Sequence, residues 1–473
     1  MKRRGYGQLI EERIPGKCTT VGPNQLPWII RSISAALLVL SALVQPGRAQ
    51  DVVAEWNQNA LQAIRTANTH FTLHARVLAM VHASIFDAVN GIDRRYAPVH
   101  VDWAALPGAS RRAAAIQAAY TVLVVMYPSQ KATLDQELDQ SLASITDDGD
   151  YQSSQSIARG RAWGAEVAQD ILAWRSTDGL SDFFPFFGGT NPGQWRSLNN
   201  PPTSMPNPQL STMVPFAMTS PTQFRTVGPP ALTSAQYAAD VQEVQAIGKS
   251  NSSIRTPEQT AIALFWTDPA VPHWNRIALT ALGDQELSLL ETARLFADLN
   301  IALADGMIAN WDTKIAYNFW RPTTAIRLAD TDGNPLTIAD PTWTPLFSPP
   351  NFPEYSSNHA VVSTAAAVVL AAFIGDNHTF THVSFSAGTS PRTHTSFSGA
   401  AAEAVESRIY GGIHFRTGCT DGILQGFNIG QYVLTTVAQR ADRGPASRSH
   451  NHGPVTIRPD GELYVGADDA PQD

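Results

Sequence analysis

Residues 353–373 read PEYSSNHAVVSTAAAVVLAAF. After the histidine, the stretch is an almost continuous run of small apolar residues, which favours a buried helix. Its front end is polar, because two serines and an asparagine precede His359, and these residue types are good helix starts. The free N–H groups and the dipole of a helix N-terminus attract anions. His359 is therefore either the first residue of a core helix or a group that acts on an anion held there.

Helical periodicity continues on both sides of this stretch, with apolar residues at three- and four-residue spacing. Strand-like runs are rare, and residues 381–388, THVSFSAG, are the best of them. The pattern predicts an all-α protein built from two helical bundles. The periodic segments are 51–68, 72–92, 111–127, 130–145, 155–175, 234–248, 288–319, 356–373, 397–410 and 421–441.

Two stretches depart from the helical pattern. Residues 183–232, which begin FFPFFGGTNPGQW, are dense in proline, glycine and asparagine, and such long connections are often functional or cover a site. Near the N-terminus, a basic flank at Arg31, the apolar run SISAALLVLSALV and the ending QPGRAQ are typical of a signal peptide cleaved after Ala49. The predicted organisation is a signal peptide over 1–49, an N-terminal helical bundle over 50–182, a connecting loop over 183–232, a second helical domain over 233–443 and a polar C-terminal tail over 444–473.

The signal peptide predicts a secreted or periplasmic protein, with a retained N-terminal anchor as the alternative. Cleavage removes Cys18 and leaves Cys419 alone, so we expect no intrachain disulfide and a buried structural thiol at Cys419. No later run has the roughly 20 apolar residues of a spanning helix, so no transmembrane segment is expected in the mature chain. The formal net charge of −8 offers no basic surface for nucleic acid.

Two further blocks offer groups that bind anions. In KIAYNFWRP, Lys314 and Arg321 lie two helical turns apart, so both can face one side. In ESRIYGGIHF, Arg408 and His414 flank a double glycine, which favours a bend after a helix end. Arginine binds tetrahedral oxyanions with two parallel hydrogen bonds, and lysine adds a compact charge. Each cation alone is more often a surface charge or a structural ion pair, but together with two histidines and a helix N-terminus they predict an oxyanion pocket.

These blocks resemble the signature of the vanadium haloperoxidase and type 2 phosphatidic acid phosphatase (PAP2) superfamily, which is K-x6-R-P, then P-S-G-H, then S-R-x5-H. The first and third blocks match fully, whereas the middle block has Ser356 in place of proline and Asn358 in place of glycine. The stretches ARVLAMVHASIFDAVNGI and ANWDTKIAYNFWRP also resemble bacterial vanadium chloroperoxidase-like proteins. The resemblance thus covers most of the mature chain. The matching residues are Lys314, Arg321, Pro322, Ser357, His359, Ser407, Arg408 and His414.

The resemblance implies a cofactor, vanadate, and a set of residues that hold it. Lys314, Arg321 and Arg408 would bind its equatorial oxygens, and Lys314 would also polarise bound peroxide. Ser357 would donate its hydroxyl. Asn358 would donate its backbone N–H as the usual glycine does, because asparagine keeps that group and tolerates left-handed backbone.

Two histidines carry the chemistry in this comparison. His414 would be the axial vanadium ligand and so the metal-binding residue, and His359 would be the acid–base group. Phe352, seven residues before His359, and Trp311, three before Lys314, match the chloroperoxidase-like arrangement. The resemblance therefore implies that the second helical domain, 233–443, is haloperoxidase/PAP2-like and carries the vanadate site.

The implied activity is that of a vanadium haloperoxidase, in which hydrogen peroxide oxidises a halide to a hypohalous acid equivalent that reacts with a small organic acceptor. Phosphate can occupy the same site, so the alternative is a secreted acid phosphatase that cleaves a phosphate ester through a phosphohistidine at His414. A third interpretation is an oxyanion-binding protein without turnover, prompted by Asn358. Simple binding does not need both histidines, which argues against it. An oligomer is compatible with the sequence.

Overall fold

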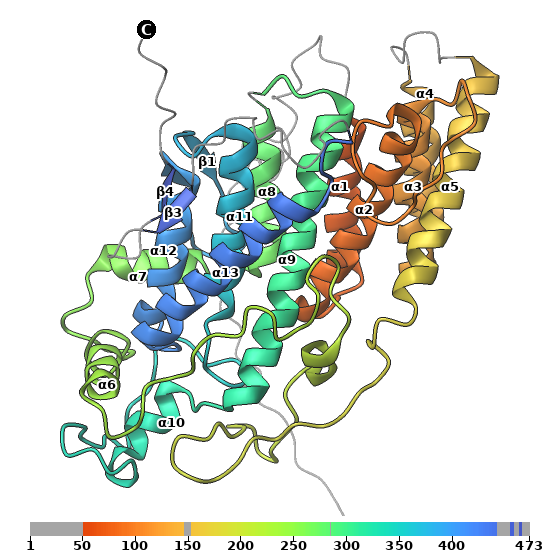
Figure 1. Cartoon of the computed structure of the whole chain (residues 1–473). Helices are drawn as coiled ribbons and strands as arrows, with labels where there is room; N and C mark the ends of the chain where they lie inside the picture. Colours follow the sequence, from red (N-terminus) through yellow and green to blue (C-terminus); the bar gives the residue numbers. More distant parts are fainter. Residues whose placement is uncertain (1–50, 146–152, 284, 442–454, 458–462, 466–473) are drawn as a thin grey trace, which may run out of the picture. The chain divides into compact units, whose positions relative to one another are not determined.

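The central element of the computed structural model is α9 (Leu289–Tyr317), a helix of 29 residues that contacts α1, α2, α11 and α13 (Figure 1). The structure describes residues 51–145, 153–283 and 285–441, together with two short strands at 455–457 and 463–465. Helix α9 begins with a capping box, in which Ser288 and Glu291 bond each other's backbone N–H. It is buried on all faces between Leu290 and Lys314, as expected for a helix inside a core.

Among the N-terminal helices, α1 and α2 contact α9 directly. Helix α3 packs between α2 and α5, and α2 packs along α9. Serine side chains cap α3 and α5 by accepting a backbone N–H of the first turn. The bounds are α1 (Val52–Thr66), α2 (His74–Asp93), α3 (Arg111–Met126), α4 (Lys131–Ala143) and α5 (Ser154–Arg175).

The connection between α5 and α6 (Ala235–Ile247) is long and mostly irregular, and it includes the proline-rich stretch noted in the sequence. Its one regular piece among the described residues is a 3₁₀ helix, Pro208–Thr212. The buried carboxylate of Asp305 in α9 fastens it, because it accepts the backbone N–H groups of residues 216–218 at 2.6, 2.8 and 2.8 Å. This loop is thus bonded to the core.

The C-terminal helices surround the opposite side of α9, with α11 packed against α9, α12 and α13 (Figure 1). Gly426 allows α13 to approach α11 closely, since a Cβ at this position would lie 2.2 Å from the carbonyl oxygen of Val361. Strands β1 and β2 form one antiparallel pair and β3 and β4 another. The bounds are α7 (Pro257–Phe265), α8 (Ala270–Leu282), α10 (Pro322–Arg327), α11 (Asn358–Ile374), β1 (Phe380–His382), β2 (Arg392–His394), α12 (Phe397–Tyr410), α13 (Arg416–Thr436), β3 (Val455–Ile457) and β4 (Leu463–Val465).

The all-α prediction is confirmed. One hydrophobic core cluster joins residues of α1–α3 to residues of α8, α9 and α11, and the chain from Gln50 onward forms one compact unit. The domain boundaries inferred from the sequence stay a prediction. Cys419 is buried as expected. None of the described helices is long and apolar enough to cross a membrane. The predicted signal peptide, 1–49, lies outside the described residues, as does the predicted tail, 444–473, apart from β3 and β4.

Candidate active site

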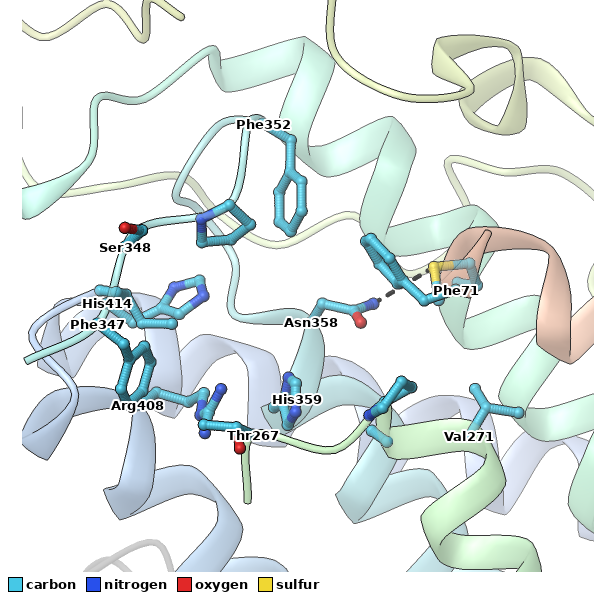
Figure 2. A pocket seen from close by; sticks show the side chains of 15 residues that line it. Phe71, Thr267, Val271, Phe347, Ser348, Phe352, Asn358, His359, Arg408 and His414 are labelled. Atoms are coloured by element: carbon cyan, nitrogen blue, oxygen red, sulfur yellow. Dashed lines mark hydrogen bonds between the residues drawn. The ribbon is translucent and has the colours of Figure 1, made fainter. Parts of the chain in front are cut away.

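A cavity of about 370 Å³ opens at the N-terminal end of α11. Its wall combines residues from distant parts of the chain: the 3₁₀ turn before α2, the loop between α7 and α8, the segment before α11 and the bend after α12. Figure 2 shows His414 and Arg408 on one side of it, and Asn358 on the side toward Phe71. The lining residues used below are Phe71, Thr267, Phe352, Asn358, His359, Arg408 and His414.

His414 is held by a buried carboxylate. Its Nδ1 lies 2.8 Å from Oε1 of Glu354, and its Nε2 lies 3.0 Å from Nη1 of Arg321. Because the guanidinium can only donate, Nε2 carries the lone pair and Nδ1–H donates to Glu354. Burial, followed by the charge of Arg321, lowers the pKa of His414 well below its usual value. His414 is therefore a neutral imidazole with its Nε2 lone pair on the side of the arginine.

Glu354 was not among the residues selected from sequence. It is fully buried, and its Oε1 also accepts the backbone N–H of Phe415 at 3.0 Å. Burial raises its pKa to about 7, opposed by the charges of Arg321 and Lys314. The glycine at position 418 leaves room for this carboxylate, because a Cβ there would clash with Oε1 at 2.5 Å. The sequence signal that could have identified Glu354 is an acidic residue inside PEYSSNH, close to the other site residues. Glu354 fixes the tautomer and the orientation of His414.

Arg321 supplies an unused donor. Its Nε donates to the carbonyl of Phe352 at 2.9 Å and its Nη1 to that of Ile413 at 2.8 Å. Its Nη2 is buried and has no hydrogen-bond partner among the described residues. Burial lowers the pKa of Arg321 to about 9, so the group stays cationic at neutral pH. An orphaned buried N–H of a cation next to His414 is what an oxyanion site requires.

Arg408 lies in the wall of the same cavity. Its Nη2 donates to the carbonyl of Trp266 at 2.7 Å and its Nε to Oγ of Ser407 at 2.9 Å. Burial lowers its pKa to about 10, which leaves it charged at neutral pH. The carbonyl of Trp266, just after α7, thus orients one of the expected cations, and sequence patterning gave no signal for this contact.

Lys314 is placed differently from the expectation. Its Nζ donates to the backbone carbonyls of Pro353, Glu354 and Ser356 at 3.0, 3.0 and 2.5 Å, which engages all three of its donors. It is fully buried and is not among the residues that line the cavity. Burial, followed by the charge of Arg321, lowers its pKa well below the usual value. The structure therefore places Lys314 against the carbonyls of the segment before α11. Arg321 and Ser357 likewise do not line the cavity.

The N-terminus of α11 is open toward an anion. Ser357 is the N-cap residue, yet its side chain makes no capping bond. Its buried hydroxyl has no nitrogen or oxygen partner among the described residues, and it lies close to the Cys419 thiol. Among the described residues, the backbone N–H groups of residues 358–360 have no hydrogen-bond partner. The side chain of Asn358 points away from the arginines, and its Nδ2 contacts Oδ1 of Asn310 at 3.3 Å and Sδ of Met307 at 3.5 Å (Figure 2). The backbone donors thus remain available.

His359 shares the cavity with these groups. Its Nε2 lies 3.3 Å from the backbone carbonyl of Asp268, so Nε2–H donates there and Nδ1 carries the lone pair. Burial and the charge of Arg408 lower its pKa well below the usual value. Figure 2 shows His359 near Arg408 and Thr267. It is therefore a neutral imidazole within the wall of the anion pocket.

An aromatic wall borders the cations. The ring of Phe352 lies 5.2 Å from that of Trp311 and 5.9 Å from that of Phe71, which comes from the N-terminal part of the chain. The guanidinium of Arg321 lies 4.7 Å from the centre of the Phe352 ring, and Nζ of Lys314 lies 5.1 Å from it. Such contacts stabilise a cation held away from water. Phe71 was missed from sequence because a single aromatic residue before a helix carries no distinguishing pattern.

Comparison with known proteins gives concordant results. Residues 294–443 match the family model described as the VCPO second helical-bundle domain. Vanadium chloroperoxidase from Curvularia inaequalis is 33% identical over 171 residues, a match that covers 29% of this chain and 27% of that protein. The matched region is therefore about a quarter of the length of that relative.

Two solved structures show the shared fold. A bacterial vanadium-dependent iodoperoxidase superposes with a TM-score of 0.71 at 24% identity, covering 85% of this chain and all of the other. A holo-type bacterial vanadium-dependent chloroperoxidase gives a TM-score of 0.61 at 17% identity, covering 77% of this chain and 91% of the other. At these identities the similarity concerns the fold.

Proposed function

We propose, on the premise that residues 294–443 carry the second helical bundle of the vanadium chloroperoxidase family, that the protein is a vanadate-dependent haloperoxidase. One observation carries the proposal. Nε2 of His414 lies 3.0 Å from Nη1 of Arg321, whose buried Nη2 has no hydrogen-bond partner among the described residues. A compact oxyanion whose central atom accepts a ligand would use both the imidazole and this N–H.

Vanadate fits this set of residues. Arg321, Arg408, the hydroxyl of Ser357 and the free N–H of Asn358 would hold its oxygens, and Nε2 of His414 would bind the vanadium. When bound, vanadate supplies Lewis-acid activation of hydrogen peroxide toward a halide. We expect phosphate to compete for the same groups, because tetrahedral phosphate accepts the same hydrogen bonds.

The chain's own residues have separate tasks. Glu354 holds His414 in the tautomer that leaves Nε2 unprotonated. His359, with its Nδ1 lone pair in the cavity wall, takes or gives a proton at the oxygen that leaves or arrives. Lys314 acts through its positive charge and by holding the carbonyls of the segment before α11 in place. From the sequence, we expected it to bind the anion directly. Phe352 excludes water from the cations.

The substrates we propose are hydrogen peroxide, a halide and a small organic acceptor. The structural relatives include an iodoperoxidase and a chloroperoxidase, so iodide, bromide and chloride should all be assayed. We further propose that the protein acts outside the cytoplasm, in keeping with the signal peptide predicted over 1–49.

A phosphatase is the second candidate. The geometry that favours it is the same imidazole, because a neutral His414 with its Nδ1–H on a carboxylate keeps an Nε2 lone pair, which becomes a nucleophile for phosphorus once Nη1 of Arg321 releases it. His359 would then protonate the leaving alcohol. A site that binds oxyanions without turnover would not need these two neutral imidazoles in one cavity.

The test separates these functions. Metal-free protein is loaded with orthovanadate or with phosphate, and halide oxidation and phosphate-ester hydrolysis are assayed side by side, with binding measured by calorimetry. We expect halide oxidation only with vanadate, inhibited by phosphate. Hydrolysis by the vanadium-free protein, without peroxidase activity after loading, would establish the phosphatase instead.

The variant His359→Ala should bind vanadate but lose turnover by about a hundredfold or more, the usual scale for an acid–base group. Full turnover in this variant would show that His359 is only the start of a buried helix.

A further inference from the structure

Three buried histidines outside the cavity form a continuous chain. Nε2 of His273 in α8 lies 2.8 Å from Nδ1 of His382 in β1. Nε2 of His382 lies 3.1 Å from Nδ1 of His394 in β2. All three are at most 9% exposed, and none lines the cavity. Each contact joins one ring nitrogen to another, so the rings form a line of hydrogen bonds.

The outer end of this histidine chain approaches the surface. Nε2 of His394 lies 3.3 Å from Oε1 of Glu403 in α12. Glu403 pairs with Arg392, which also pairs with Glu258, a side chain that is 65% exposed. Burial would raise the pKa of Glu403, but its contacts with His394, Arg392 and Trp266 outweigh burial and lower that pKa to about 2. Glu403 is therefore ionised at rest, and it takes up a proton from solvent only to pass it to His394.

The inner end reaches the cavity wall. Nδ1 of His273 lies 3.5 Å from Oδ2 of Asp268, in the loop between α7 and α8. Oδ1 of Asp268 accepts a hydrogen bond from Oγ of Ser386 at 3.2 Å, and Oγ of Ser386 lies 2.5 Å from Oγ1 of Thr267. Thr267 lines the cavity, and Figure 2 shows it near His359. The polar groups therefore follow one another from α12 to the pocket, although the contacts at the two ends of the histidine chain, 3.3 Å to Glu403 and 3.5 Å to Asp268, are close approaches and not hydrogen bonds.

We propose that His273, His382 and His394 form a proton relay that carries protons from Glu403 to the cavity through Asp268, Ser386 and Thr267. The proposal rests on the proposed function, since oxidation of a halide by hydrogen peroxide to a hypohalous acid consumes one proton per turnover. The reactants are peroxide, halide and a proton, and the products are hypohalous acid and water. A buried site that consumes protons needs a route for them.

The proton balance of the relay is closed. In the starting arrangement each ring carries its proton on Nδ1, so every donor points toward Asp268. A proton from Glu403 binds Nε2 of His394, each ring passes its Nδ1 proton to the next, and His273 releases its own to Asp268. Three N–H bonds form and three break, one O–H is broken at Glu403, and one is formed at Asp268. The hydroxyls of Ser386 and Thr267, which at rest donate to Asp268 and to the carbonyl of Leu264, rotate to pass this proton on. Asp268 then loses its O–H, each hydroxyl gains one O–H and loses one, and the last O–H forms on an oxygen in the cavity. Tautomer exchange between turnovers restores the starting arrangement.

The surroundings keep His273 and His382 uncharged at rest. Burial lowers the pKa of His382 to about 3, and burial together with Arg276 lowers that of His273 well below its usual value. A proton therefore passes through these rings without remaining on them. The charged or titratable groups that face the histidine chain are Asp268 before α8, Arg276 on α8, His359 on α11, Arg392 on β2 and Glu403 on α12.

The contact pattern argues against a metal site at this place. Four ring nitrogens bond each other in pairs, so their lone pairs do not converge on one point. No cluster of three or more potential ligands suited to a metal ion occurs among the residues that the structure describes. The remaining chemistry of such a line of imidazoles is proton transfer.

The first test uses two variants that block the path at different points, His382→Gln and Thr267→Val. We expect either change to lower kcat about tenfold, with vanadate affinity and KM for the halide unchanged, and we expect concentrated imidazole buffer to restore the rate. The double variant should be no slower than the slower single variant, because both block one path. A loss of kcat that buffer does not restore, or an unchanged kcat, overturns the relay.

His82→Gln is the matched control for burial. His82 is fully buried, its pKa is lowered to about 3 by burial as that of His382 is, and its Nε2 bonds Asn57 at 2.8 Å in the N-terminal part of the fold. This variant should show no buffer-dependent rate. A rate restored by imidazole in His82→Gln as well would mean that the rescue has nothing to do with the chain, and the relay would fail.

The second test does not need activity or correct folding of a variant. Nitrogen NMR of histidine-labelled, vanadium-free wild-type protein should show the three rings joined by hydrogen-bond couplings between their nitrogens. Absence of these couplings overturns the relay even if the enzyme is a haloperoxidase. Conversely, couplings in a protein without peroxidase activity would sink the proposed function and leave the chain to serve another proton-consuming reaction.

Discussion

Glu354 offers the sharpest test of how this site holds an anion. Its Oε1 accepts two donors, Nδ1–H of His414 at 2.8 Å and the backbone N–H of Phe415 at 3.0 Å. In Glu354→Gln the side chain keeps its shape, and one amide oxygen can still accept both bonds. These bonds change from charge-assisted, worth about 1.5–3 kcal/mol, to neutral, worth about 0.5–1.5 kcal/mol. The difference is roughly 1–2 kcal/mol per bond.

We expect the bond to His414 to matter most for binding, because it sets the basicity of Nε2. A loss of 1–2 kcal/mol corresponds to about 5- to 30-fold weaker vanadate binding. Glu354→Ala removes the acceptor altogether and leaves two buried donors unpaired, each costing about 1–3 kcal/mol, so binding should weaken further and the fold should lose stability. The order of affinities should be wild type, then Gln, then Ala.

The assay is calorimetric titration of metal-free protein with orthovanadate, alongside thermal unfolding of the same samples. His82→Gln again serves as a control for a buried polar change remote from the cavity. Equal vanadate affinity in wild type and Glu354→Gln would refute the argument that the carboxylate tunes His414. Equal affinity in all three proteins would mean that His414 does not bind the anion.

Three further outcomes are expected. Gly426→Ala should destabilise the fold by about 1–3 kcal/mol in chemical denaturation, because the new Cβ meets the Val361 carbonyl at 2.2 Å; wild-type stability would show that α13 shifts freely. Asp298 is fully buried and has no hydrogen-bond partner among the described residues, with Nε of Arg294 at 3.7 Å. Burial, opposed by the charge of Arg294, raises its pKa to about 8, so Asp298 binds its proton more tightly when folded. Wild-type stability should therefore fall by up to ~1.4 kcal/mol per unit as pH rises from about 4 to 8, and Asp298→Asn should lack this fall in pH-dependent denaturation. Asn358→Gly should keep vanadate affinity within about tenfold, since the backbone N–H remains, and should change halide preference instead; abolished binding would make the side chain a ligand contact.

The sequence determined the helical class and the order of the site blocks. The apolar periodicity of 288–319 and 356–373 predicts the core helices α9 and α11, because a helix inside a core must be apolar on most of its faces. The three blocks indicated Arg321, Arg408 and His414, and the structure brings these residues together. These residues could be found from the sequence because helix ends bind anions, and the residues that start and end a helix can be recognised from the local sequence.

The tertiary structure decided what local patterns do not encode. Helix α8 escaped the sequence analysis because prolines at 269 and 272 break the periodic pattern, yet the loop before it supplies the carbonyl that orients His359. Lys314 was expected in the pocket, but its direction depends on carbonyls about 40 residues away. The carboxylate that holds His414 and the line of three histidines likewise join segments separated by 12 to 109 residues. Hydrogen-bond direction and burial are set by neighbours in space, so only the packed fold could show which donors are satisfied and which remain free for an anion.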